Sequence, residues 1–271
     1  MTLPLPERFS RFESAPGWQP PAGGLAESLR QALEGGRLVK QEPGTLIVCS
    51  PLPGGGEAWW KLYRVSVRRR PWTLGIRSRA WREWQGLRAM ASRNLRVAPP
   101  LAFAEDRRSG FLHSSLLVTR GLEGARDLRE LLADPDRTSF EREVWLRAAG
   151  ACTRAMHDTG FGHFRLQLRN LLALPDEAGA ELALLDAPYA CAFPGPAPRA
   201  VRRIDLIDLA GPRSGLKIEE SRLVLQAYAN RETPPLELHA LRSRSSWRQK
   251  IARIALYLLL VNTGHRPAGN S

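Results

Sequence analysis

Five polar residues are spread along the chain in an order and at separations that suit one kind of chemistry. They are a lysine, a glutamate, a histidine, an asparagine and an aspartate: Lys61, Glu83, His163, Asn170 and Asp186. Transfer of a phosphoryl group from ATP needs a lysine on the phosphates, an acid that orients this lysine, and carboxylate and amide ligands for magnesium. The ordered set therefore indicates magnesium-dependent phosphoryl transfer.

The lysine and the glutamate of this set are expected to lie on a strand and on the helix that follows it. Lys61 belongs to the strand-like stretch EAWWKLYRV, in which the period of two places Trp59 and Tyr63 on the same face. Glu83 recurs at helical spacings with apolar residues, so an acid lies in the buried stripe of Ala80, Leu87 and Met90. The two charges can therefore pair, although an isolated pair of this kind is more often structural than functional.

The stretch HDTGFGHFRLQLRNLLA has the pattern of a phosphotransferase catalytic loop with one altered position. His163 and Asn170 fit the pattern, but Arg165 stands where an aspartate accepts the proton of the substrate hydroxyl. Arginine stays protonated near neutral pH, and losing the general base slows the reaction on the order of a hundredfold to ten-thousandfold. Lost catalysis is the favoured interpretation. The alternatives are that Asp158 reaches the site, or that Arg165 itself binds a phosphate or carboxylate.

The two residues suited to magnesium each come at the end of a segment. Asn170 ends the loop directly before a strand, and Asp186 ends the apolar strand ELALLD. Taken alone, Asp186 is more often a turn residue, so its role as a ligand depends on the whole ordered set. His157 and His163 have no cysteine or third histidine near them in sequence, which favours a structural histidine that braces the loop over a metal site.

The elements that must position these residues divide the chain into two lobes of an α+β fold. Residues 1–24 are rich in Pro and Gly and are expected to form an irregular lead-in. Residues 25–122 are expected to form a small lobe with an antiparallel sheet and one main helix. Residues 123–271 are expected to form a larger, mainly helical lobe that ends in a long helix over residues 236–261.

Composition sets limits on the class of protein. A chain of 271 residues with 43% hydrophobic residues is long enough to bury a sizeable core. The three cysteines, Cys49, Cys152 and Cys191, are far apart and lack metal-ligand spacing, which predicts structural thiols in a reducing compartment.

The N-terminus lacks a signal-peptide pattern, and the late apolar run over residues 254–261 is too short to cross a bilayer of roughly 30 Å. We expect a cytoplasmic protein.

The net charge of +13 is concentrated rather than spread. Residues 64–96, which begin at Arg64 and end at Arg96, contain ten arginines and one acid, Glu83. Such a segment is either a solvated basic face or a surface for an anionic partner, such as a glycolipid, a membrane surface or an acidic protein. Nucleic acid is the least favoured partner, because strands and a helix of the small lobe account for the segment.

The quoted residues together resemble one family. The chain is similar to the Kdo/heptose lipopolysaccharide kinases, bacterial relatives of eukaryotic-type protein kinases, over about residues 39–209. The loop stretch is the most specific part, and the other matching stretches support it by order and spacing: WWKLYR, RAWREWQGLRAM, VAPPLAFAE, LLVTRGLEGARDL and ALLDAPYACAF.

The resemblance implies a bilobal protein-kinase-like fold that uses ATP and Mg²⁺ to phosphorylate a sugar hydroxyl of the lipopolysaccharide inner core. It places this activity at the cytoplasmic face of the inner membrane. Lys61, Glu83, Gly44 and Gly121 then belong to the nucleotide site, and Asn170 and Asp186 to the metal site. The chain departs from the family pattern at Arg165 and in its glycine-poor phosphate-binding hairpin, where Gly44 is the one glycine between the strands.

Three functions are compatible with these observations. The favoured one is a pseudokinase of this family that acts as a regulator or scaffold in envelope glycolipid synthesis. The second is an active phosphotransferase on a core sugar that uses another base. The third is a nucleic-acid-binding protein that uses residues 64–96.

Overall fold

The computed structural model describes residues 5–20, 23–174 and 180–229. The chain divides into two compact units, of which the first comprises Met1–Arg88 and Ala98–Glu123. The second unit comprises Ala89–Val97 and Gly124–Ser271. The helix expected over residues 236–261 lies outside the described residues.

The first unit is built on a six-stranded antiparallel sheet in the order β1-β5-β6-β4-β3-β2. Its strands are β1 (Arg11–Ser14), β2 (Arg37–Glu42), β3 (Thr45–Pro51), β4 (Glu57–Arg64), β5 (Pro100–Arg108) and β6 (Phe111–Arg120). Each of β2 to β6 lies where alternating and β-branched residues between turn signals predict a strand. The central pair β4 and β6 carries Lys61 opposite Leu117.

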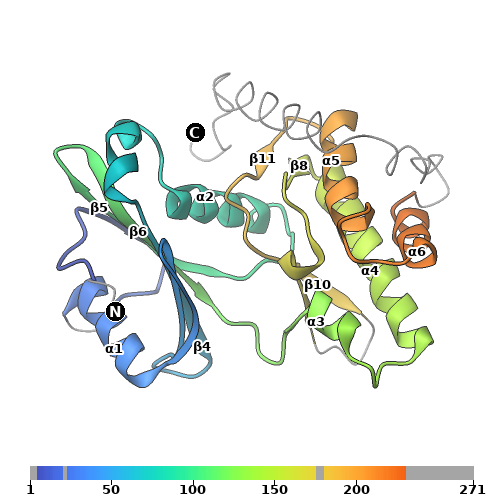
Figure 1. Cartoon of the computed structure of the whole chain (residues 1–271), viewed down its shortest axis with the longest axis horizontal. Helices are drawn as coiled ribbons and strands as arrows, with labels where there is room; N and C mark the ends of the chain where they lie inside the picture. The colour runs from blue at the N-terminus through green and yellow to red at the C-terminus, as the bar shows by residue number, and fades with distance from the viewer. Residues whose placement is uncertain (1–4, 21–22, 175–179, 230–271) are drawn as a thin grey trace. The chain divides into compact units, whose positions relative to one another are not determined.

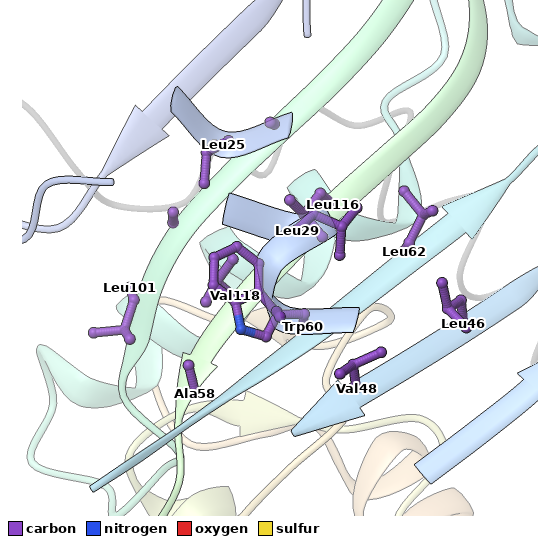
Figure 2. Packing of buried hydrophobic residues seen from close by; sticks show 13 residues of the cluster. Leu25, Leu29, Leu46, Val48, Ala58, Trp60, Leu62, Leu101, Leu116 and Val118 are labelled. Atoms are coloured by element: carbon purple, nitrogen blue, oxygen red, sulfur yellow. The ribbon is translucent and has the colours of Figure 1, made fainter. Parts of the chain in front are cut away.

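The period of two gives the two faces of this sheet different partners. Helix α1 (Gly24–Gly35) packs Leu25 and Leu29 onto the face that includes Trp60 and Val118, as Figure 2 shows. The residue between Trp60 and Leu62 points the other way, so Lys61 faces helix α2 (Arg79–Ala91). The apolar side of the amphipathic helix α1 thus packs on one face, and Lys61 on the other face contacts the buried acid of α2.

Two features of this unit differ from the expectations. Arg11–Ser14 is a strand that pairs with β5, although residues 1–24 were expected to be irregular. Helix α1 has 12 residues and α2 has 13. A short 3₁₀ helix, η1 (Val67–Thr73), joins β4 to α2, and its only apolar residues are exposed, which removes the periodic signal that would predict it.

The second unit is mainly helical, as expected, and its elements surround the loop that contains Arg165. Its helices are α3 (Leu128–Ala133), α4 (Ser139–Asp158), α5 (Arg199–Ala210), α6 (Ile218–Ala229) and the 3₁₀ turn η2 (Leu168–Asn170). Its short strands are β7 (Arg126–Asp127), β8 (Phe161–Gly162), β9 (Leu171–Leu174), β10 (Glu181–Leu184) and β11 (Cys191–Ala192). The α+β class predicted from the sequence is confirmed.

Helix α4 is the long central element of this unit (Figure 1). A capping box, in which Thr138 and Glu141 bond to each other's backbone N–H groups, starts it, and Gly160 at φ 84° follows its end. Helix α6 approaches so closely that a Cβ on Gly150 would lie 2.2 Å from the Val224 carbonyl oxygen. This close packing fixes α4, and therefore the loop that follows it.

Candidate functional site

In the first unit, Lys61 and Glu83 form a buried ion pair. The Lys61 Nζ donates to Glu83 Oε1 at 2.7 Å, and the Tyr63 hydroxyl donates to Glu83 Oε2 at 2.9 Å. The Glu83 side chain is 0% exposed and that of Lys61 is 12% exposed. A buried carboxylate needs such partners, because an uncompensated charge in the interior is strongly destabilising. The contact with Glu83 fixes the position of the Lys61 ammonium.

A second buried carboxylate holds the start of the helix that carries Glu83. Glu105 of β5 accepts from the Ser78 backbone N–H at 3.3 Å and pairs with Arg107 at 2.8 Å. Burial alone would raise the pKa of Glu105, but the hydrogen bonds from Arg107 and Ser78 outweigh burial and lower this pKa below its ordinary value. Glu105 is therefore ionised at neutral pH and anchors the entry to α2.

In the second unit, the backbone of the loop is held by an aspartate that the sequence analysis did not single out. Asp205 of α5 is fully buried, and its Oδ2 accepts from the His163 backbone N–H at 2.8 Å. The same oxygen lies 3.2 Å from His157 Nε2, and His157 Nδ1 lies 2.9 Å from the Tyr228 hydroxyl oxygen. His157 is thus structural, as predicted, and links α4, α5 and α6 to the start of the loop.

His163 braces the other side of the loop. Its Nε2 lies 2.8 Å from the carbonyl oxygen of Leu185, the residue before Asp186. A carbonyl can only accept, so Nε2 carries the proton in this contact. In the described part of the chain, the buried Nδ1 has no hydrogen-bond partner. The histidine thereby ties the loop to the end of the strand that leads to Asp186.

Asn170 closes the loop. Its Nδ2 donates to the carbonyl oxygen of Arg165 at 2.7 Å, and its own carbonyl accepts from the Leu185 backbone N–H at 2.9 Å. The Nδ2 is thus already engaged in a hydrogen bond. The Oδ1 is the atom of this side chain that is suited to bind a cation. The structure therefore brings His163, Arg165 and Asn170 together. His163 and Asn170 both bind the backbone of Leu185, and Asp186 is the next residue.

Two residues around this loop adopt backbone conformations that L-residues rarely adopt. Phe164 has φ 62° and Asp186 has φ 50°. Such conformations cost on the order of 1–3 kcal/mol each and persist where the surroundings enforce them, often at functional sites. Phe164 is buried against Phe193 and Val201, so packing enforces its conformation. The position of Arg165, the next residue, follows from it.

Arg165 brings a cation to the middle of this framework. The side chain is partly exposed, and its guanidinium carbon lies 5.9 Å from the centre of the Tyr189 ring. The alternative base, Asp158, is engaged elsewhere: it forms ion pairs with Arg154 and with Arg202, the latter at 3.3 Å. Asp158 thus contacts two arginines, and the arginine at position 165 cannot accept a proton.

The two glycines assigned to the nucleotide site lie at opposite ends of β4. Gly44 accepts from the Arg64 backbone N–H at 2.9 Å, and Gly121 donates to the Glu57 carbonyl at 2.7 Å. Glu42 pairs with Thr45, so Pro43 and Gly44 alone connect β2 to β3. A connection of two residues is a tight hairpin and supplies no glycine-rich loop to cover phosphates.

Metal and thiol chemistry have little support elsewhere. Within residues 5–20, 23–174 and 180–229, no three or more His, Cys, Asp or Glu side chains are grouped to hold a metal ion. The cysteines are free, and burial raises the pKa of Cys49 and Cys191 to about 11 and that of Cys152 to about 12. All three are protonated thiols at neutral pH, as structural cysteines are.

Comparison with known proteins adds the family. The profile of the lipopolysaccharide kinase (Kdo/WaaP) family matches residues 56–190, which include Lys61, Glu83, the loop and Asp186. This chain belongs to that family. Asp205, which holds the loop of this family member, lies beyond the matched residues.

A solved structure supports the fold of this lipopolysaccharide kinase family member. WaaP in complex with acyl carrier protein is similar with a TM-score of 0.58 at 19% identity, over 93% of this chain and 98% of that chain. At this identity the likeness concerns the fold alone, which is therefore kinase-like. No curated protein sequence matches the chain significantly. None of the described helices is long and apolar enough to cross a membrane.

Proposed function

We propose that this member of the lipopolysaccharide kinase family is a pseudokinase, which acts as a regulator or scaffold in the synthesis of bacterial envelope glycolipids. The observation that carries the proposal is Arg165. The surrounding framework holds the loop at its backbone, through His163, Asn170 and Asp205, and none of these contacts needs a base at position 165. The loop can therefore keep its conformation while the proton acceptor is absent.

We further propose that part of the nucleotide site is retained. Lys61, oriented by Glu83, is suited to ATP phosphates, and Asn170 Oδ1 and the Asp186 carboxylate are oxygen ligands of the kind Mg²⁺ takes. When bound, Mg²⁺ neutralises charge on the phosphates. The tight hairpin at Pro43 and Gly44 fits this site poorly, and it predicts weak binding.

A thermal-shift titration with ATP, with and without magnesium, tests the nucleotide site independently of catalysis. Under the proposal, ATP raises the melting temperature of the wild type, and Lys61→Met abolishes the rise. Ligand binding stabilises only the form that binds, so the shift grows with ATP concentration. An unchanged melting temperature at millimolar ATP would contradict a retained site and leave the assignment of Arg165 intact.

Restoring the base tests the pseudokinase proposal directly. We expect Arg165→Asp to transfer phosphate from ATP to a lipopolysaccharide core fraction at least about a hundredfold faster than the wild type, because it restores the general base. Arg165→Asn is the matched control, because it removes the cation without adding a base, and it should gain little. A wild type as fast as Arg165→Asp would refute the proposal.

The second candidate is an active phosphotransferase that uses another base, and the intact Lys61–Glu83 pair favours it. It predicts measurable turnover by the wild type that Asp186→Ala abolishes. Absence of ATP consumption with every lipopolysaccharide fraction would count against it.

The partners and the location follow from the same family and from the charge. We propose that the protein acts at the cytoplasmic side of the inner membrane and that its basic residues between Arg64 and Arg96 meet an anionic partner. Acyl carrier protein, with which WaaP has been solved, makes an acidic protein one such partner. A nucleic-acid partner is disfavoured; salt-sensitive binding to DNA or RNA would revive it.

A further inference from the structure

A pocket of about 390 Å³ lies in the first unit, on the face of the sheet opposite Lys61. Arg64, Ser114 and Asp106 line it and are cross-strand partners on β4, β6 and β5. Paired residues project from the same face of a sheet, and this row continues the face on which Leu62 and Leu116 pack under α1. The pocket is therefore separate from the Lys61–Glu83 pair.

The pocket is strongly basic. Three arginines line it, Arg64, Arg70 and Arg108, together with one carboxylate, Asp106, which is 3.3 Å from Arg108. Among the described residues, no carboxylate forms an ion pair with Arg64 or Arg70 that would neutralise the pocket further. Two positive charges thus remain without a counter-charge, in a cavity of the size that holds small ligands.

Two buried polar atoms in the lining have no hydrogen-bond partner among the described residues. They are the Oγ of Ser114, a residue only 4% exposed, and the Nε of Arg70. Buried polar atoms are nearly always hydrogen-bonded, so these two atoms are available to donate to an anionic ligand in the pocket. Burial lowers the pKa of the adjacent His113, and the charges of Arg70 and Arg108 lower it further, against the effect of Asp106. The positive field of the arginines thus reaches across the pocket.

Exposed apolar residues continue directly from the pocket. Val67 lines the pocket and is 70% exposed, and it is followed by Trp72, Leu74 and Ile76, which are 78%, 60% and 55% exposed. Single exposed apolar residues are ordinary, but four within ten residues concentrate exposed apolar side chains in one segment. The sequence from Arg64 to Arg82 contains no acidic residue. Within this segment, the exposed apolar side chains are therefore interspersed with basic residues and with no acidic ones.

We propose that this pocket binds the phosphate group of an anionic phospholipid, while Val67, Trp72, Leu74 and Ile76 enter the interfacial layer of the membrane. Basic residues that surround exposed Trp, Leu and Ile side chains characterise elements that lie in an anionic bilayer surface. A nucleic acid would need several stacking faces, and of the four exposed apolar residues only Trp72 offers one. An acidic protein accounts for the charge but not for a pocket whose buried lining contains unpartnered polar atoms. The inference needs no nucleotide and no catalysis; it rests on the proposed anionic partner of the basic segment and names that partner as a phospholipid.

Vesicle flotation with the full chain tests the proposal. We expect binding to phosphatidylcholine vesicles that contain phosphatidylglycerol and little binding to phosphatidylcholine alone. The double variant Arg64→Gln/Arg70→Gln should lower the affinity by about fivefold for each charge removed, and thus by about 25-fold in total. Trp72→Ala should lower it roughly tenfold, because the exposed indole contributes apolar burial in the interface.

Matched controls separate the pocket from charge in general. Arg129→Gln/Arg213→Gln removes two exposed arginines of the second unit, and Phe140→Ala removes an aromatic side chain that is 74% exposed. Both controls should bind vesicles nearly as well as the wild type. If they lose as much binding as the pocket variant and Trp72→Ala, the proposal is overturned.

Further arms distinguish the source of the anion. The lipid proposal is overturned if the protein binds inorganic phosphate but not vesicles. It is also overturned if the pocket variant no longer binds an acidic protein such as acyl carrier protein but still binds vesicles. Trp72→Ala changes an exposed side chain, so it remains decisive if the double variant fails to fold. The assay contains no ATP and no sugar acceptor. Its failure therefore leaves the pseudokinase proposal untouched, and the reverse also holds.

Discussion

Each of the two units of this protein uses a fully buried carboxylate to hold a functional element, but the two carboxylates hold different things. In the first unit, Glu83 holds a side chain, the ammonium of Lys61. In the second unit, Asp205 holds a backbone, the N–H of His163. A contact to a side chain is lost when that residue is replaced. A contact to a backbone N–H does not depend on the side chain at that position or on the residue two positions later. The second unit can therefore replace its catalytic residue by Arg165 and keep the loop, and the first unit has no such freedom at Lys61.

The largest effect is expected at the backbone anchor. Asp205→Ala leaves the His163 N–H and His157 without their acceptor in the interior, and we expect a loss of about 3–5 kcal/mol in the free energy of unfolding. Asp205→Asn keeps an oxygen acceptor and should lose clearly less. Urea denaturation followed by circular dichroism measures both. A loss by Asp205→Ala below that of Asp205→Asn would mean that the loop does not depend on this anchor.

The next effect is expected at the ion pair. Glu83→Ala leaves the Lys61 ammonium and the Tyr63 hydroxyl unpaired, and we expect a loss of about 3 kcal/mol. The double variant Lys61→Met/Glu83→Leu removes both charges and should recover most of this stability, because a buried pair can be replaced by apolar residues at little cost. Failure of the double variant to recover stability would show that the pair holds the unit together by more than charge compensation.

The smallest effect concerns Glu105, which anchors α2 from β5. Hydrogen bonds lower its pKa, so its contribution to stability is complete above the ordinary glutamate pKa of about 4.3 and is lost as the pH falls through the folded-state pKa. Glu105→Gln should therefore cost about 1 kcal/mol at pH 7, and the difference from the wild type should shrink below about pH 4.

A surface pair provides the control for this pH dependence. Glu143 and Arg147 form an exposed pair within α4, and Glu143→Gln should change stability by only about 0.3 kcal/mol. Thermal melts of the three proteins from pH 3 to pH 7 make the comparison. A cost at Glu105 that is independent of pH would assign it to packing instead of charge.

The sequence predicts the Lys61–Glu83 pair because the strand pattern around Lys61 and the helix pattern around Glu83 each depend on neighbouring residues only. Period two orients Lys61, and spacings of three and four place Glu83 in a buried stripe with Leu87 and Met90, all of which are fully buried. The same reasoning applies to Asp205, which lies four residues after Val201 and four before Leu209 on the buried face of α5. The position of Asp205 in an apolar stripe of α5 therefore predicts a buried acid in the same way.

Other features depend on residues far apart in the chain, and local patterns cannot predict them. β1 is four residues long, and its partner β5 is about ninety residues away in the sequence. The basic pocket joins the row Arg64, Ser114 and Asp106, which only the register of three strands brings together. Periodicity predicts elements and faces, whereas register and long-range pairing require the folded chain.

The strand β1 also has a consequence for solubility. A sheet has two lateral edges, and an edge with unpaired N–H and C=O groups can recruit strands of other molecules. Here β1 covers β5, and at the other edge β2 carries the charged residues Lys40 and Glu42 and an irregular register at Leu38. Removal of the residues before Gly23 would uncover β5, whose side chains are mostly buried, and turn this protected edge into a template for aggregation.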